Sequence, residues 1–153
     1  MADVATKEWK ILVAVDEGEE SMHALSWCLK NVLLLLSLIL VCGFGSGYLF
    51  SADMMVAMDK YSNDVAECVV EKAKKMCKDL HDVKVETRIE HGDPRDVICQ
   101  MTEKLGADVL VMGSHGYGLI KRALLGSVSN HCAQNVQCPV LIVKKPKSTA
   151  ANN

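Results

Sequence analysis

The sequence predicts an α/β domain built around a parallel sheet of five strands. Short apolar runs alternate with longer amphipathic stretches along the whole chain, and this alternation is typical of strand-helix units. Two of the runs, residues 10–15 and 138–143, are mainly apolar, as expected of strands that helices cover on both faces. The length of 153 residues suits one domain, which we place at residues 7–145 between flexible ends at 1–6 and 146–153.

The first strand leads into the first of two helices in the N-terminal half. It ends at Asp16, and a helix is expected at about residues 21–31, where apolar side chains recur at helical spacing. A second, longer helix is expected at about residues 52–80. Its apolar positions are separated by lysines and acidic residues, which indicate a solvated face.

Residues 32–42 form an apolar run whose structure is ambiguous. The run is shorter than the ~20 residues of a membrane-spanning helix, so we interpret it as a buried strand with its flank. Only Asn31 separates it from the preceding helix, whereas such connections usually take ~2–6 residues. Either the helix frays early, or it continues through the leucines at 33–35 and the strand is confined to 38–41. A loop is expected at residues 43–53.

The C-terminal half alternates strands and helices more regularly. Apolar and charged residues alternate at 83–90, which predicts a partly exposed strand at a sheet edge. Asp93 and Pro94 predict the N-cap and first position of a helix that ends at Gly106. The predicted core positions of this helix are Val97, Ile98, Met101 and Leu105. The remaining elements are two strands and the helix between them, at residues 108–112, 138–143 and 127–136.

Composition and charge are those of an ordinary globular protein, with 50% hydrophobic residues, 24% charged residues and a net charge of −2. This charge gives no reason to expect binding to nucleic acid or to an anionic membrane. The seven cysteines and five histidines show no metal-ligand spacing, so we expect no metal site. An odd number of cysteines without a recognisable secretory segment leads us to expect a reducing, cytoplasmic environment.

The most informative functional motif is the glycine-rich stretch that follows the strand at 108–112. Gly113 and Gly116 come first, and Gly126 and Ser127 stand where the next helix begins. Glycines let backbone N–H groups approach an anion closely, and a helix N-terminus adds unpaired donors. The Ser127 hydroxyl either caps the helix or contacts a phosphate. A tight turn without a ligand is the alternative interpretation of the same glycines.

The spacing of these glycines resembles the nucleotide-binding signature of the universal stress protein family. Two residues separate Gly113 from Gly116, and nine more precede Gly126 and Ser127. The motif is not a P-loop, because Gly-x4-Gly-Lys-[Ser/Thr] does not occur in the chain. It is also not the dinucleotide fingerprint, which belongs to a first strand.

Asp16 is the second functional candidate. Open α/β sheets place ligand-recognition groups at the carboxyl ends of their strands, and Asp16 ends the first one. The residue itself leaves two alternatives open, because an aspartate here also commonly caps the following turn or helix. The sequence Val-Ala-Val-Asp resembles the family's opening strand, whose terminal aspartate contacts the nucleoside. The resemblance, to plant-type single-domain members especially, covers residues 7–145 and is weakest at 31–53.

The resemblance implies a Rossmann-like open parallel sheet of strand order 3-2-1-4-5 with helices on both faces. The first and fourth strands are then neighbours, so Asp16 and Gly113 face one crevice where such folds bind ligands. The implied function is that of a stress-response regulatory protein that binds ATP or AMP, with Mg²⁺ as a possible companion. The implied contacts are Ala14, Val15 and Val41 at the adenine, Asp16 at the nucleoside, Gly113 and Gly116 beside the ribose and phosphates, and Gly126, Ser127, Val128 and Ser129 at the phosphates. Met112 belongs to the same implied site.

An enzymatic alternative is a slow ATP hydrolase or phosphotransferase. It would need a base near the γ-phosphate and a metal ion, and His115 is the base that the loop offers. Side chains on adjacent residues generally diverge, so we expect Ser114 and His115 not to form a nucleophile–base pair. We therefore expect no catalytic residues and no enzymatic activity.

A non-catalytic alternative is a dimeric interaction protein with a damaged nucleotide pocket. The short connections around residues 31–53 predict a loose adenine end, with low affinity and poor discrimination between ATP and GTP. In every case we expect a homodimer formed through Val140, Leu141, Ile142 and Val143. These residues form a short apolar strand at a predicted sheet edge, and the family resemblance implies the same pairing.

Overall fold

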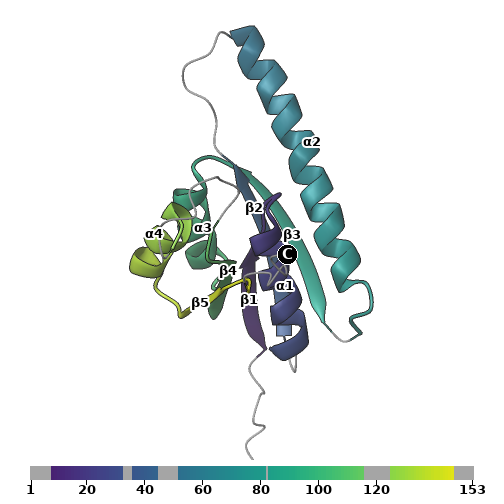
Figure 1. The fold of residues 1–153 in the computed structure, drawn as a ribbon, viewed down its shortest axis with the longest axis vertical. Helices are drawn as coiled ribbons and strands as arrows, with labels where there is room; N and C mark the ends of the chain where they lie inside the picture. Colours follow the sequence, from purple (N-terminus) through teal and green to yellow (C-terminus); the bar gives the residue numbers. More distant parts are fainter. Residues whose placement is uncertain (1–7, 33–35, 45–51, 82, 116–124, 147–153) are drawn as a thin grey trace, which may run out of the picture.

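A computed structural model describes residues 8–32, 36–44, 52–81, 83–115 and 125–146 (Figure 1). Its five strands are parallel and follow the order β3-β2-β1-β4-β5, which confirms the predicted Rossmann-like sheet. The elements are β1 (Trp9–Ala14), α1 (Glu19–Asn31), β2 (Leu36–Phe44), α2 (Ala52–Cys77), β3 (Lys84–His91), α3 (Pro94–Lys104), β4 (Val109–Gly113), α4 (Ser127–Asn135) and β5 (Val140–Val143).

Helices cover both faces of the sheet. On one face Ile11 and Val13 of β1 pack in a core cluster with α1 and α2, and on the other Leu12 and Ala14 pack with α3 and α4. Figure 1 shows these two layers on opposite sides of the strands. Because successive side chains of a strand point to opposite faces, β1 must be apolar at consecutive positions. Each such side chain that becomes fully buried contributes about 1.5–3 kcal/mol.

Strand β2 ends later in the chain than either sequence interpretation allowed. It pairs with β1 from Leu36 and with β3 as far as Phe44, so it is not confined to residues 38–41. Residues 43 and 44, which were assigned to a loop, also belong to it. Hydrogen-bonded neighbours on both sides satisfy the backbone along this length, and that pairing outweighs the helix preference of leucine. The leucines at 33–35 and the loop residues 45–51 lie outside the described residues.

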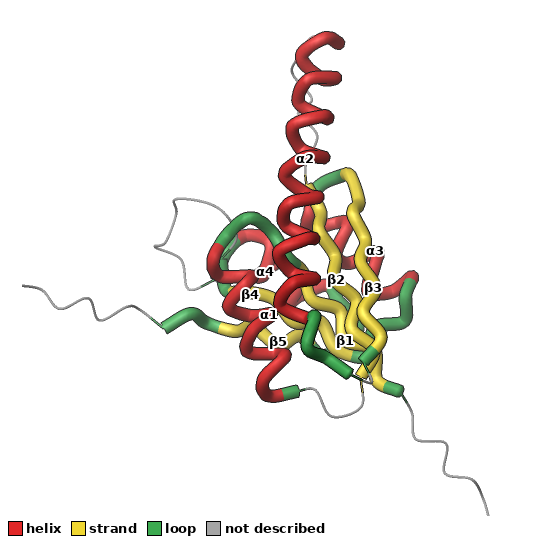
Figure 2. The backbone as a smooth tube through the Cα atoms, turned by 90° about the vertical axis from the view of Figure 1, so that its right-hand side faces the viewer, coloured by secondary structure: helices red, strands yellow, loops and turns green. Residues whose placement is uncertain are grey.

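Helix α2 packs on the sheet through its C-terminal half. Its buried residues are Ala66, Val69, Val70, Ala73 and Cys77, which recur at helical spacing. Figures 1 and 2 show the N-terminal half continuing past the ends of β2 and β3. Among the described helices, none is long and apolar enough to cross a membrane.

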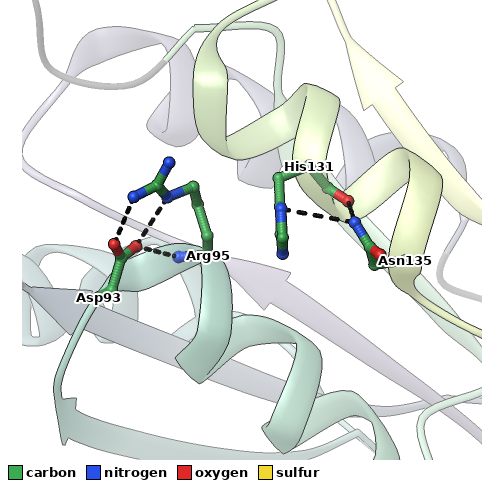
Figure 3. A network of polar contacts seen from close by, with 4 residues as sticks. All are labelled: Asp93, Arg95, His131 and Asn135. Atoms are coloured by element: carbon green, nitrogen blue, oxygen red, sulfur yellow. Dashed lines mark hydrogen bonds and ion pairs between the residues drawn. The ribbon is translucent and has the colours of Figure 1, made fainter.

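The start of α3 confirms the capping prediction. Asp93 is the N-cap, and its Oδ1 accepts a hydrogen bond of 2.9 Å from the backbone N–H of Arg95. The Arg95 guanidinium also donates to the carboxylate, and these bonds lower the pKa of Asp93 to about 2 (Figure 3). His131 and Asn135 of α4 lie across from this pair. Gly106, in the left-handed region at φ 62°, follows the end of the helix as expected.

Candidate functional site

The candidate site lies where β1 and β4 end side by side. These strands pair from Ile11 with Val109 to Val13 with Val111, so the turns that follow them emerge at the same edge of the sheet. The sheet order changes direction here, because β1 has β2 on one side and β4 on the other. Ligands of open α/β folds bind at such a switch point. The structure therefore places the Asp16 turn beside the glycine-rich segment.

Asp16 holds the turn between β1 and α1. Its Oδ1 accepts hydrogen bonds from the Gly18 N–H and from the Ser21 hydroxyl, both at 2.9 Å. The Asp16 N–H in turn lies 3.0 Å from the Ser21 oxygen, and Ser21 is buried. This is the turn-forming role that the sequence left open as an alternative. Contact with a nucleoside stays a prediction for this carboxylate.

Gly113 is required by helix packing. A Cβ atom at this position would lie 2.9 Å from the backbone carbon of Glu20 and 3.0 Å from its oxygen. Real Cβ atoms essentially never approach backbone atoms this closely, so a side chain would force α1 away from β4. The sequence interpretation had assigned the bare backbone of Gly113 to the ligand. Its contact with Glu20 was not visible because the two positions lie 93 residues apart along the chain.

We expect Gly113→Ala to lower the free energy of unfolding by about 1–3 kcal/mol, because the added methyl group overpacks the contact with α1. Urea denaturation measures this change. Gly126→Ala is the matched control, since Gly126 has an ordinary φ of −66° and a methyl group there introduces no backbone strain. Equal stability of Gly113→Ala and the wild type would show that α1 adjusts without cost.

The two ends of the glycine-rich loop are tied together at Ser114. Its carbonyl oxygen accepts hydrogen bonds from the Gly126 N–H and from the Ser129 hydroxyl, both at 2.7 Å. Ser129 is buried and also lies 3.1 Å from the Gly126 oxygen. These bonds fix the N-terminus of α4 beside the end of β4. Ser129 thus has a structural role that sequence reasoning missed, because it depends on a carbonyl 15 residues away.

The start of α4 decides one of the sequence alternatives. Gly126 is the N-cap and makes no side-chain capping bond, so the interpretation of Ser127 as a helix cap is wrong. Ser127 is the first helical residue and is exposed, and Val128 beside it is half-buried. Both backbone N–H groups belong to the first turn of the helix, where such donors lack intrahelical partners. Gly116 lies outside the described residues.

The residues assigned to the adenine end belong to the core. Val41 is fully buried, and its carbonyl oxygen accepts a 2.9 Å hydrogen bond from the Val15 N–H. Ala14, Val41 and Met112 pack in the cluster under α3 and α4, whereas Val15 packs on the opposite face. Pairing with β1 on one side and β3 on the other therefore fixes the position of Val41 in the sheet. One premise of the loose adenine end, a strand confined to residues 38–41, is therefore wrong, and the low affinity and poor discrimination between ATP and GTP stay a prediction.

Ser114 and His115 contact each other, so the expectation that their side chains diverge is wrong. The Ser114 Oγ lies 3.1 Å from His115 Nδ1 and 3.3 Å from Glu20 Oε2. The carboxylate from the start of α1 accounts for this geometry, because it holds the serine hydroxyl between the two groups. Ser114 is only 4% exposed, so its side chain is buried. The contact links α1 to β4.

The turn between β1 and α1 is strongly acidic. It contains Asp16 and Glu17, Glu19 and Glu20 begin α1, and Lys145 after β5 forms an ion pair with Glu19. Burial, and then the charges of Asp16 and Glu17, raise the pKa of the Cys42 thiol to about 11. The negative charge thus reaches the end of β2. Among the residues shown in colour in Figure 1, no three acidic, histidine or cysteine side chains are grouped to hold a metal ion.

Comparisons of the sequence and of the structure with known proteins point to the same family. The sequence profile of the Universal stress protein family matches residues 9–144. Universal stress protein MJ0531 of Methanocaldococcus jannaschii is 44% identical over 78 residues, which make up 51% of this chain and 45% of that protein. The chain spans less than two thirds of the length of the curated relatives it matches.

Two solved structures share the fold. That of MJ0577 from the same archaeon has 28% identity and a TM-score of 0.68, and the match covers 92% of this chain and 98% of that one. A family protein from Arabidopsis thaliana, solved with AMP bound, has 23% identity and a TM-score of 0.66. That match covers 95% of this chain and 97% of the other, and at this identity it shows the fold alone.

Proposed function

Because the chain belongs to the universal stress protein family, we propose that it binds ATP or AMP between the ends of β1 and β4 and acts as a stress-response regulator. The observation that carries this proposal is the pair of hydrogen bonds that the Ser114 carbonyl oxygen accepts from the Gly126 N–H and the Ser129 hydroxyl. These hydrogen bonds fix the N-terminus of α4 beside the end of β4, the neighbour of the strand that leads to Asp16, so the proposed phosphate donors and the proposed nucleoside acceptor lie at the same edge of the sheet. The AMP complex of the Arabidopsis relative supports the ligand class.

The roles proposed for the site follow from its geometry. The first-turn N–H groups of α4, at Ser127 and Val128, donate to phosphate oxygens, as helix N-termini do for anions. Gly126 leaves room for the phosphates to approach these donors. Asp16 accepts from the nucleoside while its Oδ1 keeps the turn closed. Ser129 and Gly113 hold the surrounding backbone in place.

A divalent cation is expected to accompany a triphosphate. The acidic turn that carries Asp16 and Glu17 lies next to the proposed phosphate site, and like charges there disfavour a free polyanion. Mg²⁺ bound to the phosphates would reduce this repulsion. AMP carries less charge, so its binding should depend less on the cation.

Titration of the full chain with ATP and with AMP, each with and without Mg²⁺, tests the proposal. Ligand binding raises the melting temperature, because saturation at 100 times the Kd stabilises the folded state by about 2.7 kcal/mol. Mass spectrometry of the extracted ligand identifies the bound species. Absence of any shift at millimolar nucleotide would contradict the proposal.

We also propose that the protein is not an enzyme and acts in the cytoplasm. The Ser114 hydroxyl supports the first statement, because it is in contact with His115 and its side chain is almost entirely buried. Sustained release of ADP during incubation with ATP, lost in His115→Ala, would contradict it. Seven free thiols are in keeping with a reducing compartment.

Strand β5 is proposed to form a homodimer, so we expect Leu141→Lys to lower the mass of the assembly by removing the β5 contact. β5 lies at one edge of the sheet, and Val140, Leu141 and Ile142 are half-buried in the single chain. Unpaired strand edges readily pair with a second copy, and a lysine here opposes that contact. Light scattering at micromolar concentration measures the mass, and circular dichroism verifies the fold.

The control for this prediction is Val85→Lys. Val85 lies on β3 at the opposite edge of the sheet and is 36% exposed, so the same kind of change there should leave the mass unchanged. A wild-type monomer, or an unchanged mass in folded Leu141→Lys, would show that β5 is not an interface.

A further inference from the structure

A hollow of about 470 Å³ lies between α2 and the start of α1, outside the proposed nucleotide contacts. One stripe of α2 forms most of its lining. The stripe consists of Tyr61, Asp64, Val65, Cys68, Val69 and Lys72, and Glu17 and Met22 complete the hollow. Residues three and four positions apart share one face of a helix, so these six follow a single side of α2 for about three turns.

The stripe carries apolar side chains that are open to solvent. Cys68 at its centre is exposed, and Tyr61 at its N-terminal end, at 69% exposed, is the most open of the large apolar residues whose burial the structure describes. Val69 and Val65 pack toward the core and form the floor. Figure 2 shows α2 as the outermost element on this side of the sheet, with no other helix lying over it. An apolar stripe with this exposure is a candidate contact surface.

The charges on the stripe are arranged symmetrically. Asp64 and Lys72 lie four residues before and after Cys68, which is about 6 Å along the helix in each direction. Within the part of the chain that the structure describes, neither charge has an ion-pair partner. An antiparallel copy of α2 centred on Cys68 would bring Asp64 of each chain opposite Lys72 of the other. The stripe is therefore complementary to itself.

We propose that a second copy of this chain docks on the α2 stripe, antiparallel about a two-fold axis that passes near Cys68. The apolar centre is buried between the helices, and two Asp64–Lys72 ion pairs close its ends. This contact lies on the β3 side of the sheet, whereas β5 forms the opposite edge. The two interfaces are thus independent, and together they link chains into assemblies larger than a dimer.

A charge exchange tests the register directly. In the Leu141→Lys background, which removes the β5 contact, the chain should form dimers through α2 by sedimentation velocity. Asp64→Lys or Lys72→Glu alone places like charges opposite each other and should raise the dimer Kd about tenfold or more. The double variant restores opposite charges and should recover the dimer. Lys74→Glu, the same charge change on the other flank of α2, should have little effect.

Cross-linking of the otherwise unmodified chain provides a second measurement that does not depend on β5. All seven cysteines lie in the described ranges, and Cys68 alone is exposed. Diamide should therefore yield a covalent dimer that Cys68→Ser abolishes, with two thiols oxidised to one disulfide and diamide reduced to the hydrazine. Asp64→Lys should slow the cross-link, and the charge-exchanged double variant should restore its rate.

Failure of the double variant to recover association would overturn the proposed register. A Leu141→Lys chain that stays monomeric, together with no cross-link through Cys68 in the wild type, would overturn the proposal and leave the stripe to another occupant. Neither readout requires nucleotide, so failure here is distinguishable from failure of the proposed ATP or AMP binding.

Discussion

Gly126→Val is expected to abolish binding of ATP and AMP while leaving the chain folded. Gly126 is the N-cap of α4, at the point where phosphates would meet the first helical N–H groups. A valine side chain there occupies the space that the phosphates need. We expect the affinity to fall by at least about 100-fold, or ~2.7 kcal/mol. Calorimetric titration with each nucleotide gives the affinity, and urea denaturation gives the stability.

The backbone conformation at Gly126 excludes strain as a cause of the expected loss of affinity. Its φ of −66° and ψ of 164° are open to any residue, so backbone strain, which a positive φ would have introduced, does not contribute. The bond from its N–H to the Ser114 oxygen is also kept in the variant. Gly126→Ala serves as the graded control and should lose less affinity than valine. Unchanged affinity in Gly126→Val, and in Gly116→Val, would remove the phosphate assignment.

The elements that the sequence predicted well are those set by local chemistry. Strand β1 is apolar at consecutive positions because each face of the sheet needs its own core contacts, and this pattern can be recognised from the sequence alone. The cap of α3 is likewise local, since Asp93 bonds to a backbone N–H two residues later. The strand order followed from the family resemblance, which rested on the spacing of the glycines and on the strand that ends at Asp16.

The features that the sequence did not predict depend on contacts between distant residues. The length of β2 is fixed by pairing with β1 and β3, and leucine-rich sequence alone does not reveal such pairing. The need for glycine at 113 arises from Glu20, and the alignment of Ser114 with His115 involves the same glutamate. Sequence spacing therefore located the site correctly at the turns, but it assigned to the ligand several residues that hold the backbone.

Asp16→Ala is expected to weaken binding of ATP, AMP and adenosine alike, because the proposed contact is to the nucleoside that all three share. Loss of a hydrogen bond to a charged group should cost about 1.5–3 kcal/mol of binding free energy. Binding of inorganic triphosphate should be spared. Titration of the variant with the four ligands measures this pattern. A defect confined to the ligands with phosphates would show that the nucleotide lies in the opposite direction.

The structural role of Asp16 requires a control in the same experiment. Alanine also removes the acceptor for the Gly18 N–H and the Ser21 hydroxyl, so part of any effect comes from a loosened turn. Ser21→Ala loosens the same turn but leaves the carboxylate in place, and it should lower stability while largely keeping affinity. Asp16→Asn keeps an oxygen acceptor for Gly18 but loses the charge, and its affinity should fall close to that of Asp16→Ala. If Ser21→Ala loses as much affinity as Asp16→Ala, the carboxylate acts through the turn and does not contact the nucleoside.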